Sequence, residues 1–377
     1  IAMRFTVNSA ELLNVLQILD KVILTKNITP IQSCVLFEVS ENVLRLRSTD
    51  KEITLSCSLD LIDSSGDYKI AINAKRILDI LKTIPEQPLT FDVNPSSLQI
   101  NLDYQNGHMV FQGENADEFP ALKTIDGDIT SFTVPTKALN IALGNAMVAA
   151  STDSSRQAMQ GVLFDLTPED FAVVASDGRK LARTLVECNV HDITSNFILP
   201  PKPIGIIRSI FDKFDGEVSI VTNTEGNATF EIGRFALYCR LVQEPYPNYR
   251  RVIPQNNDRI ATIDRNSLVN ALRRVIAIAD KSTCLVKLQL DSDKMTLSAE
   301  NNNYAQSAEE QIMCQYDNVP IKIGFQGDFL LDLINRLSGD EIVLKLSDPS
   351  RAGLIVPVTQ EEQTQVVMLI MPLLITN

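Results

Sequence analysis

Few side chains in this sequence have the type and the spacing that acid–base, nucleophilic or metal chemistry requires. The two histidines, His108 and His191, belong to no HxxxH or HxE motif. Phosphate-binding loops of the GxxxxGKS/T or GxGxxG type and the GxSxG nucleophile motif do not occur. Acidic pairs such as Glu309-Glu310 have the pattern of solvated strand charges, and only convergence with other carboxylates in a cleft would make them catalytic. We therefore predict no catalytic residue, no metal ligand and no cofactor.

The cysteines include no CxxC pair and show no disulfide-like spacing, so we interpret them as reduced core thiols. They are Cys34, Cys57, Cys188, Cys239, Cys284 and Cys314. No signal-peptide pattern is present. The apolar stretch at 366–375 is shorter than the roughly 20 residues that cross a membrane. These features predict a cytoplasmic protein with no membrane partner.

The charge balance bears on possible partners. The chain has 377 residues and a formal net charge of −13, and this length predicts two or three domains. An acidic total disfavours an indiscriminate nucleic-acid binder, because phosphate affinity comes from Lys and Arg. A local basic face remains compatible with that total.

Apolar residues recur with helical periodicity in six segments. Their anchor residues are spaced by roughly 64 residues, and unrelated helices would not fall on such a grid. The expected helices are 9–22, 74–84, 136–148, 201–214, 265–279 and 327–337, with anchors at Ala10, Ala74, Lys137, Pro201, Asn266 and Gly327.

Short alternating strands lie between these helices, and they repeat with a period of about 126 residues. Polar turns centred on Asp50, Asp177 and Asn301 separate pairs of strands. A proline in FPAL (119–122), YPNY (246–249) and MPLL (371–374) recurs at a similar interval. We therefore predict an α+β protein of three similar domains, 3–126, 127–253 and 254–377, each with two helices and antiparallel sheet.

Positive charge is concentrated on the predicted helices. Windows around the six helices contain 13 Lys and Arg against seven Asp and Glu, in a chain whose totals are 34 and 47. Exposed helical Lys and Arg are ordinarily just solvated. Segregation of this kind is nevertheless compatible with a basic face that attracts a polyanion while the rest of the surface repels it.

Several motifs together resemble the bacterial sliding clamp, the beta subunit of DNA polymerase III. They are ASDGRKLA (175–182), YPNYRRVIP (246–254), the terminal MPLL, the opening MRFTV, AKRILDILKTIP, ADEFPAL, GVLFDL and IKIGFQGDFLLDLI. The resemblance covers essentially the whole chain from Met3. It implies three DNA-clamp domains per subunit and a head-to-tail homodimeric ring. Such a ring encircles duplex DNA without reading its sequence and serves as the processivity factor of the replicative polymerase.

The resemblance also implies a hydrophobic pocket that accepts a short peptide, a Gln followed by Leu and Phe. Such peptides come from the replicative polymerase, the clamp loader and repair polymerases. Carried over position by position, the pocket comprises Met159, Ser176, Gly178, Arg179, Lys180, Leu181, Pro247, Arg251, Val252, Gln326, Phe329, Leu369, Ile370, Met371, Pro372 and Leu373. Taken alone, each apolar member is more typical of core packing than of a pocket. The tail is expected to form a strand at 366–371, and the resemblance does not place Leu374 to Asn377.

Two further sets of residues follow from the resemblance. The dimer interface is expected to bring Arg76, Met109 and Phe111 of one subunit against Ala277, Ile278, Glu309 and Glu310 of the other. The expected DNA contacts are Lys26, Arg156, Lys202 and Arg208. The alternative interpretation is a three-repeat peptide-binding scaffold that neither closes into a ring nor binds DNA.

Overall fold

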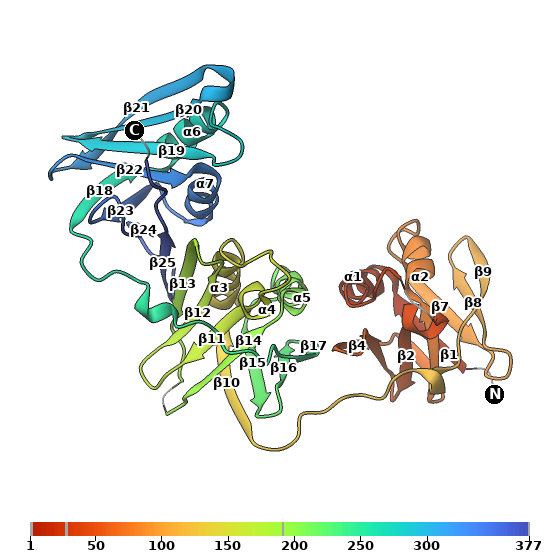
Figure 1. The fold of residues 1–377 in the computed structure, drawn as a ribbon. Helices are drawn as coiled ribbons and strands as arrows, with labels where there is room; N and C mark the ends of the chain where they lie inside the picture. Colours follow the sequence, from red (N-terminus) through yellow and green to blue (C-terminus); the bar gives the residue numbers. More distant parts are fainter. Residues whose placement is uncertain (1–2, 27–28, 191, 376–377) are drawn as a thin grey trace. The chain divides into compact units, whose positions relative to one another are not determined.

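The computed structural model describes residues 3–26, 29–190 and 192–375 (Figure 1). The predicted site residue candidates lie within these ranges, whereas His191, Thr376 and Asn377 lie outside the described residues. The chain forms two compact units, one of Ile1–Thr136 with Lys202–Leu241 and the other of Lys137–Pro201 with Val242–Asn377.

All six predicted helices are confirmed. The described residues form α1 (Ser9–Leu19), α2 (Ala74–Leu81), α3 (Thr136–Met147), α4 (Gln157–Gln160), α5 (Pro201–Phe211), α6 (Arg265–Ile276) and α7 (Gly327–Arg336). Helix α4 was not predicted, because a single turn is too short to show periodicity. The side chains of Asn8, Asn73 and Asp264 accept backbone N–H groups in the first turns of α1, α2 and α6, which satisfies donors that a helix start leaves free.

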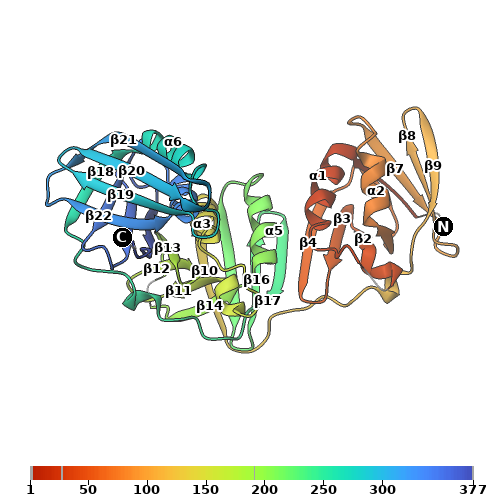
Figure 2. The same ribbon diagram turned by 45° about the horizontal axis from the view of Figure 1, so that its top comes forward.

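Two antiparallel sheets make up the first unit. A five-stranded sheet has the order β5 (Asp63–Ser65), β1 (Met3–Asn8), β7 (Pro88–Val93), β8 (Gln99–Tyr104) and β9 (Gly107–Gln112). An eight-stranded sheet has the order β10 (Ile129–Pro135), β15 (Glu217–Asn223), β16 (Asn227–Ile232), β17 (Phe235–Arg240), β4 (Ile53–Asp60), β3 (Val43–Thr49), β2 (Cys34–Ser40) and β6 (Tyr68–Asn73). Helices α1 and α2 pack side by side against these sheets (Figures 1 and 2).

The second unit is built on a twelve-stranded sheet. Its first half has the order β14 (Ser195–Leu199), β11 (Val162–Leu166), β12 (Phe171–Ser176), β13 (Lys180–Val186), β25 (Thr364–Ile370) and β24 (Gly353–Pro357). It continues with β23 (Glu341–Leu346), β18 (Arg259–Asp264), β21 (Gln306–Tyr316), β20 (Lys294–Asn301), β19 (Leu285–Asp291) and β22 (Ile321–Gln326). Helices α6 and α7 lie against each other on this sheet.

The three repeats are joined by β-ladders. Strand β4 of the first repeat pairs with β17 of the second, with Leu55 opposite Leu237. Strand β13 of the second repeat pairs with β25 of the third, with Ala182 opposite Met368. The middle repeat therefore contributes strands to sheets of both its neighbours, which explains why it is divided between the two units.

At each end of the series of three repeats, the strand equivalent to these joining strands is an edge strand of its sheet. Strand β9 ends the five-stranded sheet, and it occupies the place in its repeat that β17 and β25 occupy in theirs. Strand β21 corresponds to β4 and β13. Its residues 306–313 pair with β20 alone, since only residues 314–316 reach β18. Within the described strands, one side of each is unpaired.

The prediction that three prolines mark equivalent repeat ends is wrong for the third copy. Pro120 and Pro247 lie well beyond the ends of β9 and β17, whereas Pro372 follows the last residue of β25 with one residue between. The repeating feature is a single bridge after the last strand of each repeat. Ala71 pairs with Glu114, Ile198 with Val242 and Gly324 with Leu373.

None of the six cysteines forms a disulfide, and five are buried. Burial raises the pKa of the Cys34 and Cys57 thiols to about 12, and it raises those of Cys188 and Cys314 to about 11. The thiolate is the reactive form, so these groups are nearly all protonated and unreactive at neutral pH.

We therefore expect native protein at pH 7.5 to react with iodoacetamide at least about 100-fold more slowly than free cysteine, because each raised pKa lowers the thiolate fraction. Mass spectrometry of the alkylated protein measures this. Unfolding in guanidinium should expose all six thiols. Rapid labelling of one cysteine in the folded protein would contradict the assignment of these residues as inert core groups.

Candidate protein-interaction site

The turn between β12 and β13 has a fixed backbone. The Asp177 carboxylate accepts the N–H groups of Arg179 and Lys180 at 2.8 and 2.9 Å. The Ser176 hydroxyl donates to the carbonyl of Lys180 at 2.9 Å and accepts the N–H of Gly178 at 3.1 Å. Gly178 has φ +89°, a conformation that costs glycine little and strains other residues. These contacts present the turn as a rigid surface element.

The turn, the 246–254 linker and the last strand meet at one hydrophobic cluster, as the resemblance implied. Leu181, Leu369 and Tyr249 are buried in this cluster, and Tyr246 and Ile253 pack against it. Leu181, Leu369 and Ile370 are at most 3% exposed. They therefore lie beneath the surface, as the floor of the site, and their side chains are not open to solvent.

Other predicted pocket residues are accessible above this floor. Met159 is half-buried, and its Cε lies 3.9 Å from the position that a Cβ on Gly178 would take. In the linker, Pro247, Arg251 and Val252 are exposed, Val252 to 53%. Exposed apolar side chains beside a turn with a rigid backbone are typical of a surface that binds another protein.

The C-terminal segment crosses from the turn to the third repeat. The N–H of Met371 donates to the carbonyl of Arg179, and the N–H of Leu373 donates to that of Gly324, both at 2.8 Å. Met371 is 42% exposed and Leu374 is 83% exposed. Pro372 and Leu373 are half-buried. The tail is thus held by its backbone and displays apolar side chains.

A cavity of about 520 Å³ lies between the turn, the 150–153 loop and α7. Lys180 lines it and is only 8% exposed. The Lys180 ammonium lies over the ring of Phe329, 4.3 Å from its centroid, a favourable contact for a desolvated cation. Gln326, the half-buried N-cap residue of α7, makes no capping hydrogen bond through its side chain. The cavity adds a polar compartment to the apolar surface.

The predicted subunit-contact residues fall in two places. Met109 and Phe111 are half-buried on the edge strand β9, and Met109 borders a shallow hollow with Arg76 and Ile80 of α2. The Arg76 guanidinium donates to the Gln112 carbonyl at 3.3 Å.

The complementary set lies at the end of α6 and on β21. Ala277 is exposed and Ile278 is half-buried just beyond the helix. Glu309 is exposed on β21, whereas Glu310 forms an ion pair with Arg274 of the same chain. That pair lowers the pKa of the Glu310 carboxyl.

The predicted DNA contacts occupy different environments. Lys26 is exposed in the loop after α1. The Lys202 ammonium donates to the Val22 carbonyl and to Asp50, both at 2.6 Å, so its charge is already paired. Arg208 is half-buried on α5. The structure places Arg156 at the pocket turn, where it donates to the carbonyl of Asp177 at 3.3 Å.

Sequence reasoning missed the contacts that hold the linker. Tyr249 and Arg250 bind Asp165 and Asp170, which are about 80 residues earlier in the chain. It also missed the pairing of Leu373 with Gly324. The only available signal was the equal spacing of the repeats, which places Leu373 near the positions of Glu114 and Val242.

Two absences apply to the described part of the chain. No group of three or more His, Cys, Asp or Glu residues there is placed to hold a metal ion. No helix among these residues is long and apolar enough to cross a membrane.

Comparison with known families covers nearly the whole chain. Family models of the N-terminal, central and C-terminal domains of the DNA polymerase III beta subunit match residues 3–123, 133–248 and 250–371. A beta sliding clamp of Pseudomonas aeruginosa is 25% identical over 367 residues, covering 97% of this chain and 99% of that protein. One of Caulobacter vibrioides is 26% identical over 363 residues, covering 94% and 96%.

Solved structures agree with the fold. The DnaN sliding clamp of Bartonella birtlesii bound to griselimycin superposes with a TM-score of 0.90 at 27% identity, with 100% of both chains covered. The Pseudomonas aeruginosa clamp bound to griselimycin gives a TM-score of 0.93 at 24% identity, with 99% of this chain and 100% of that chain covered.

Proposed function

The chain belongs to the family of the DNA polymerase III beta subunit, and we propose that two copies of it close head to tail into a ring around duplex DNA. It is a sliding clamp, the processivity factor that tethers the replicative polymerase to its template. The three clamp domains are proposed to span 3–126, 127–253 and 254–377.

The dimer proposal rests on one observation. The exposed fraction of the side chain at one equivalent strand position differs between β9 and the two strands that form the internal joins. At the two joins within the chain, Leu237 and Met368 are fully buried at 0% exposure. Met109 holds the same position in β9 and is only half-buried, and its neighbour Val110 is 52% exposed. A partner strand on β9 would bury both residues as the internal joins do.

The free edge of β21 is the natural partner for β9, since β21 is the equivalent of β4 and β13. Carrying over the register of the internal ladders places Ala308 of one subunit opposite Met109 of the other. Arg76 of α2 and Ala277 and Ile278 beyond α6 would flank the ladder. Two such contacts per dimer leave no free sheet edge at these positions.

We propose that DNA passes through the ring on loose phosphate contacts from basic side chains on the helices and in the loops beside them. Such contacts carry no sequence information, and weak contacts permit sliding where tight ones would impede it. Lys26, Arg156, Lys202 and Arg208 remain the candidates. Lys202 is the weakest of them, since Asp50 already neutralises its charge.

We further propose that the candidate protein-interaction site binds short peptides of the replicative polymerase, the clamp loader and repair polymerases. The peptide's Leu and Phe would lie over Leu181 and Leu369, against Met159, Val252 and Met371. Each apolar anchor gains about 1.5–3 kcal/mol on full burial. The Bartonella birtlesii clamp was solved with griselimycin bound, which supports a ligand-binding pocket in this family. We propose a cytoplasmic, non-catalytic role.

A topological experiment tests the ring. Protein loaded on nicked circular DNA should stay bound in high salt, and cutting the circle with a restriction enzyme should release it, because a ring leaves linear DNA only by sliding off its ends. Gel filtration of DNA with labelled protein measures this. Equal retention on circular and linear DNA, or a monomer at micromolar concentration, would favour the non-ring scaffold instead.

A further inference from the structure

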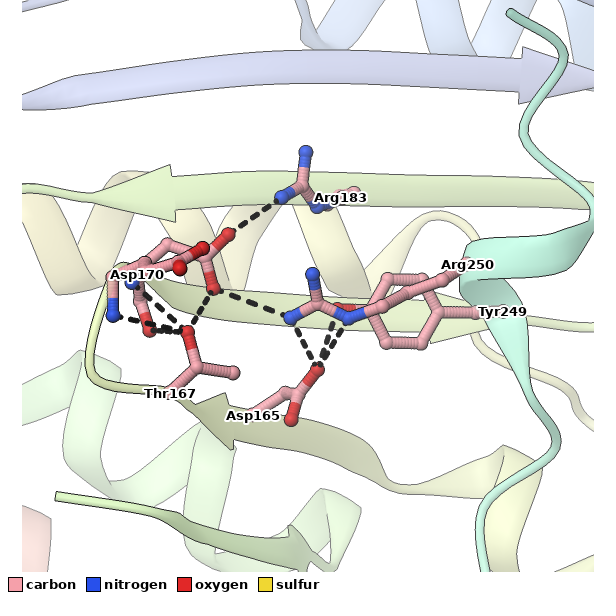
Figure 3. Close-up of polar contacts among 7 residues, drawn as sticks. Asp165, Thr167, Asp170, Arg183, Tyr249 and Arg250 are labelled. Carbon is pink, nitrogen blue, oxygen red and sulfur yellow. Dashed lines mark hydrogen bonds and ion pairs between the residues drawn. The ribbon is translucent and has the colours of Figure 1, made fainter.

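The linker between the second and third repeats is anchored by a polar network (Figure 3). Its 3₁₀ turn η3 (Tyr249–Arg251) binds the end of β11. The Tyr249 hydroxyl donates to the Asp165 carboxylate at 2.6 Å, and the Arg250 guanidinium donates to the same oxygen at 2.8 and 3.2 Å. Arg250 also reaches Asp170 at 3.2 Å. Two consecutive side chains therefore hold one turn.

The strand side of the network is itself fixed. The Arg183 guanidinium donates to Asp170 at 3.1 Å, and the Thr167 hydroxyl donates to the same carboxylate at 3.0 Å. Two guanidinium groups thus balance two carboxylates. Partial burial raises the pKa of Asp170, but the hydrogen bonds from Arg250 and Thr167 outweigh it and hold that pKa below its usual value. The carboxylate is ionised, as the network requires.

The first linker, which follows β9, provides an internal comparison because it has no such network. By the repeat spacing, Leu122 and Lys123 stand where Tyr249 and Arg250 stand in the second linker. Lys123 donates to the carbonyl of Lys51 and lies over the ring of Tyr238.

The strand residues that correspond to Asp165 and Asp170 in the first repeat also lack this network. Glu38 replaces Asp165 and pairs with Lys69, and Val43 replaces Asp170. A clamp linker can therefore be held on its domain without these charges. The network is present only at the linker that borders the peptide pocket.

We propose that Tyr249 and Arg250 are positioning residues for that pocket, an inference that rests on the peptide-binding function proposed above. A 3₁₀ turn has three residues per turn, so consecutive side chains diverge by about 120°. Fixing residues 249 and 250 against β11 determines where Arg251 and Val252 project. Both are exposed, as a peptide-contacting surface requires.

The test compares Arg250→Gln with Lys123→Gln, its matched control in the first linker. Binding of a fluorescein-labelled peptide containing Gln-Leu-Ser-Leu-Phe is measured by polarisation. Arg250→Gln should weaken binding by about tenfold, Arg250→Lys should recover part of the loss, and Lys123→Gln should bind as the parent protein does. Asp165→Asn should weaken binding similarly, and the double variant Asp165→Asn/Arg250→Gln should add little further.

If Arg250 acts by positioning its neighbours, the effect of replacing it must depend on whether the Val252 side chain is present. In a Val252→Ala background, Arg250→Gln should cost clearly less than tenfold, because one of the two side chains that it positions is gone. Unchanged affinity in Arg250→Gln would overturn the proposal. So would an equal loss in both backgrounds, or a loss explained by partial unfolding in the melting curve. If the parent protein itself fails to bind the peptide, the proposed pocket fails instead.

Discussion

Replacing Met109 by glutamate is expected to convert the proposed dimer into a monomer over the micromolar range. The equivalent residues at the internal joins, Leu237 and Met368, are fully buried, so a charge at this position would be enclosed when β9 pairs with β21. An uncompensated buried charge costs about 3 kcal/mol, and a closed ring contains two such contacts. Dimer affinity should fall by at least about 1,000-fold. Sedimentation velocity across a dilution series measures it.

Ile129→Glu is the matched control for this variant. It introduces the same charge on another strand of the first unit, at a side chain that is already 58% exposed. It should dimerise as the parent protein does. Met109→Glu should keep its melting temperature and its peptide affinity, since the pocket lies in the second unit. A Met109→Glu protein that remains dimeric would exclude β9 as the interface strand.

The helices and the repeat were predictable because they depend on local periodicity. Each helix shows its apolar face within a dozen residues, and roughly equal spacing reveals three copies. Strand pairing is different. The joins of β4 with β17 and of β13 with β25 unite residues about 180 positions apart, and no local pattern states which edges meet. The role of Pro372 was mispredicted for the same reason. Its spacing from Pro247 fits the repeat, but it follows the end of β25 far more closely than Pro247 follows the end of β17.

The candidate site shows the same division. The resemblance implied that the turn, the linker and the tail lie together, and the three segments share one hydrophobic cluster. The depth of each side chain was not predictable, and the pocket candidates Leu181 and Leu369 are buried beneath the surface. The anchoring of Arg250 by Asp165 depends on a tertiary contact between two unremarkable charged residues. Sequence spacing carries no signal for such a pair.

Ending the chain at Ile370 is expected to weaken peptide binding by at least about 100-fold while leaving the dimer intact. The truncation keeps the whole β13–β25 ladder, whose last pair is Lys180 with Ile370. It removes Met371, which is 42% exposed beside the turn, and both backbone hydrogen bonds that hold the tail. A peptide Leu and a peptide Phe that each lose one wall together forfeit about 2.7 kcal/mol, which is 100-fold in affinity. Fluorescence polarisation with the labelled peptide measures it.

A chain ending at Leu373 is the matched control, since it keeps Met371 and the hydrogen bond of Leu373 with Gly324. Its peptide affinity should stay within about threefold of the parent value, because Leu374 is 83% exposed and lies beyond the last backbone contact. If the longer truncation also lost the dimer and melted early, the tail would be part of the core. If both truncations lost binding equally, the exposed Leu374 would itself be a peptide contact. Retained binding in both would remove the tail from the pocket and leave only the turn and the linker, which Arg250 holds in place.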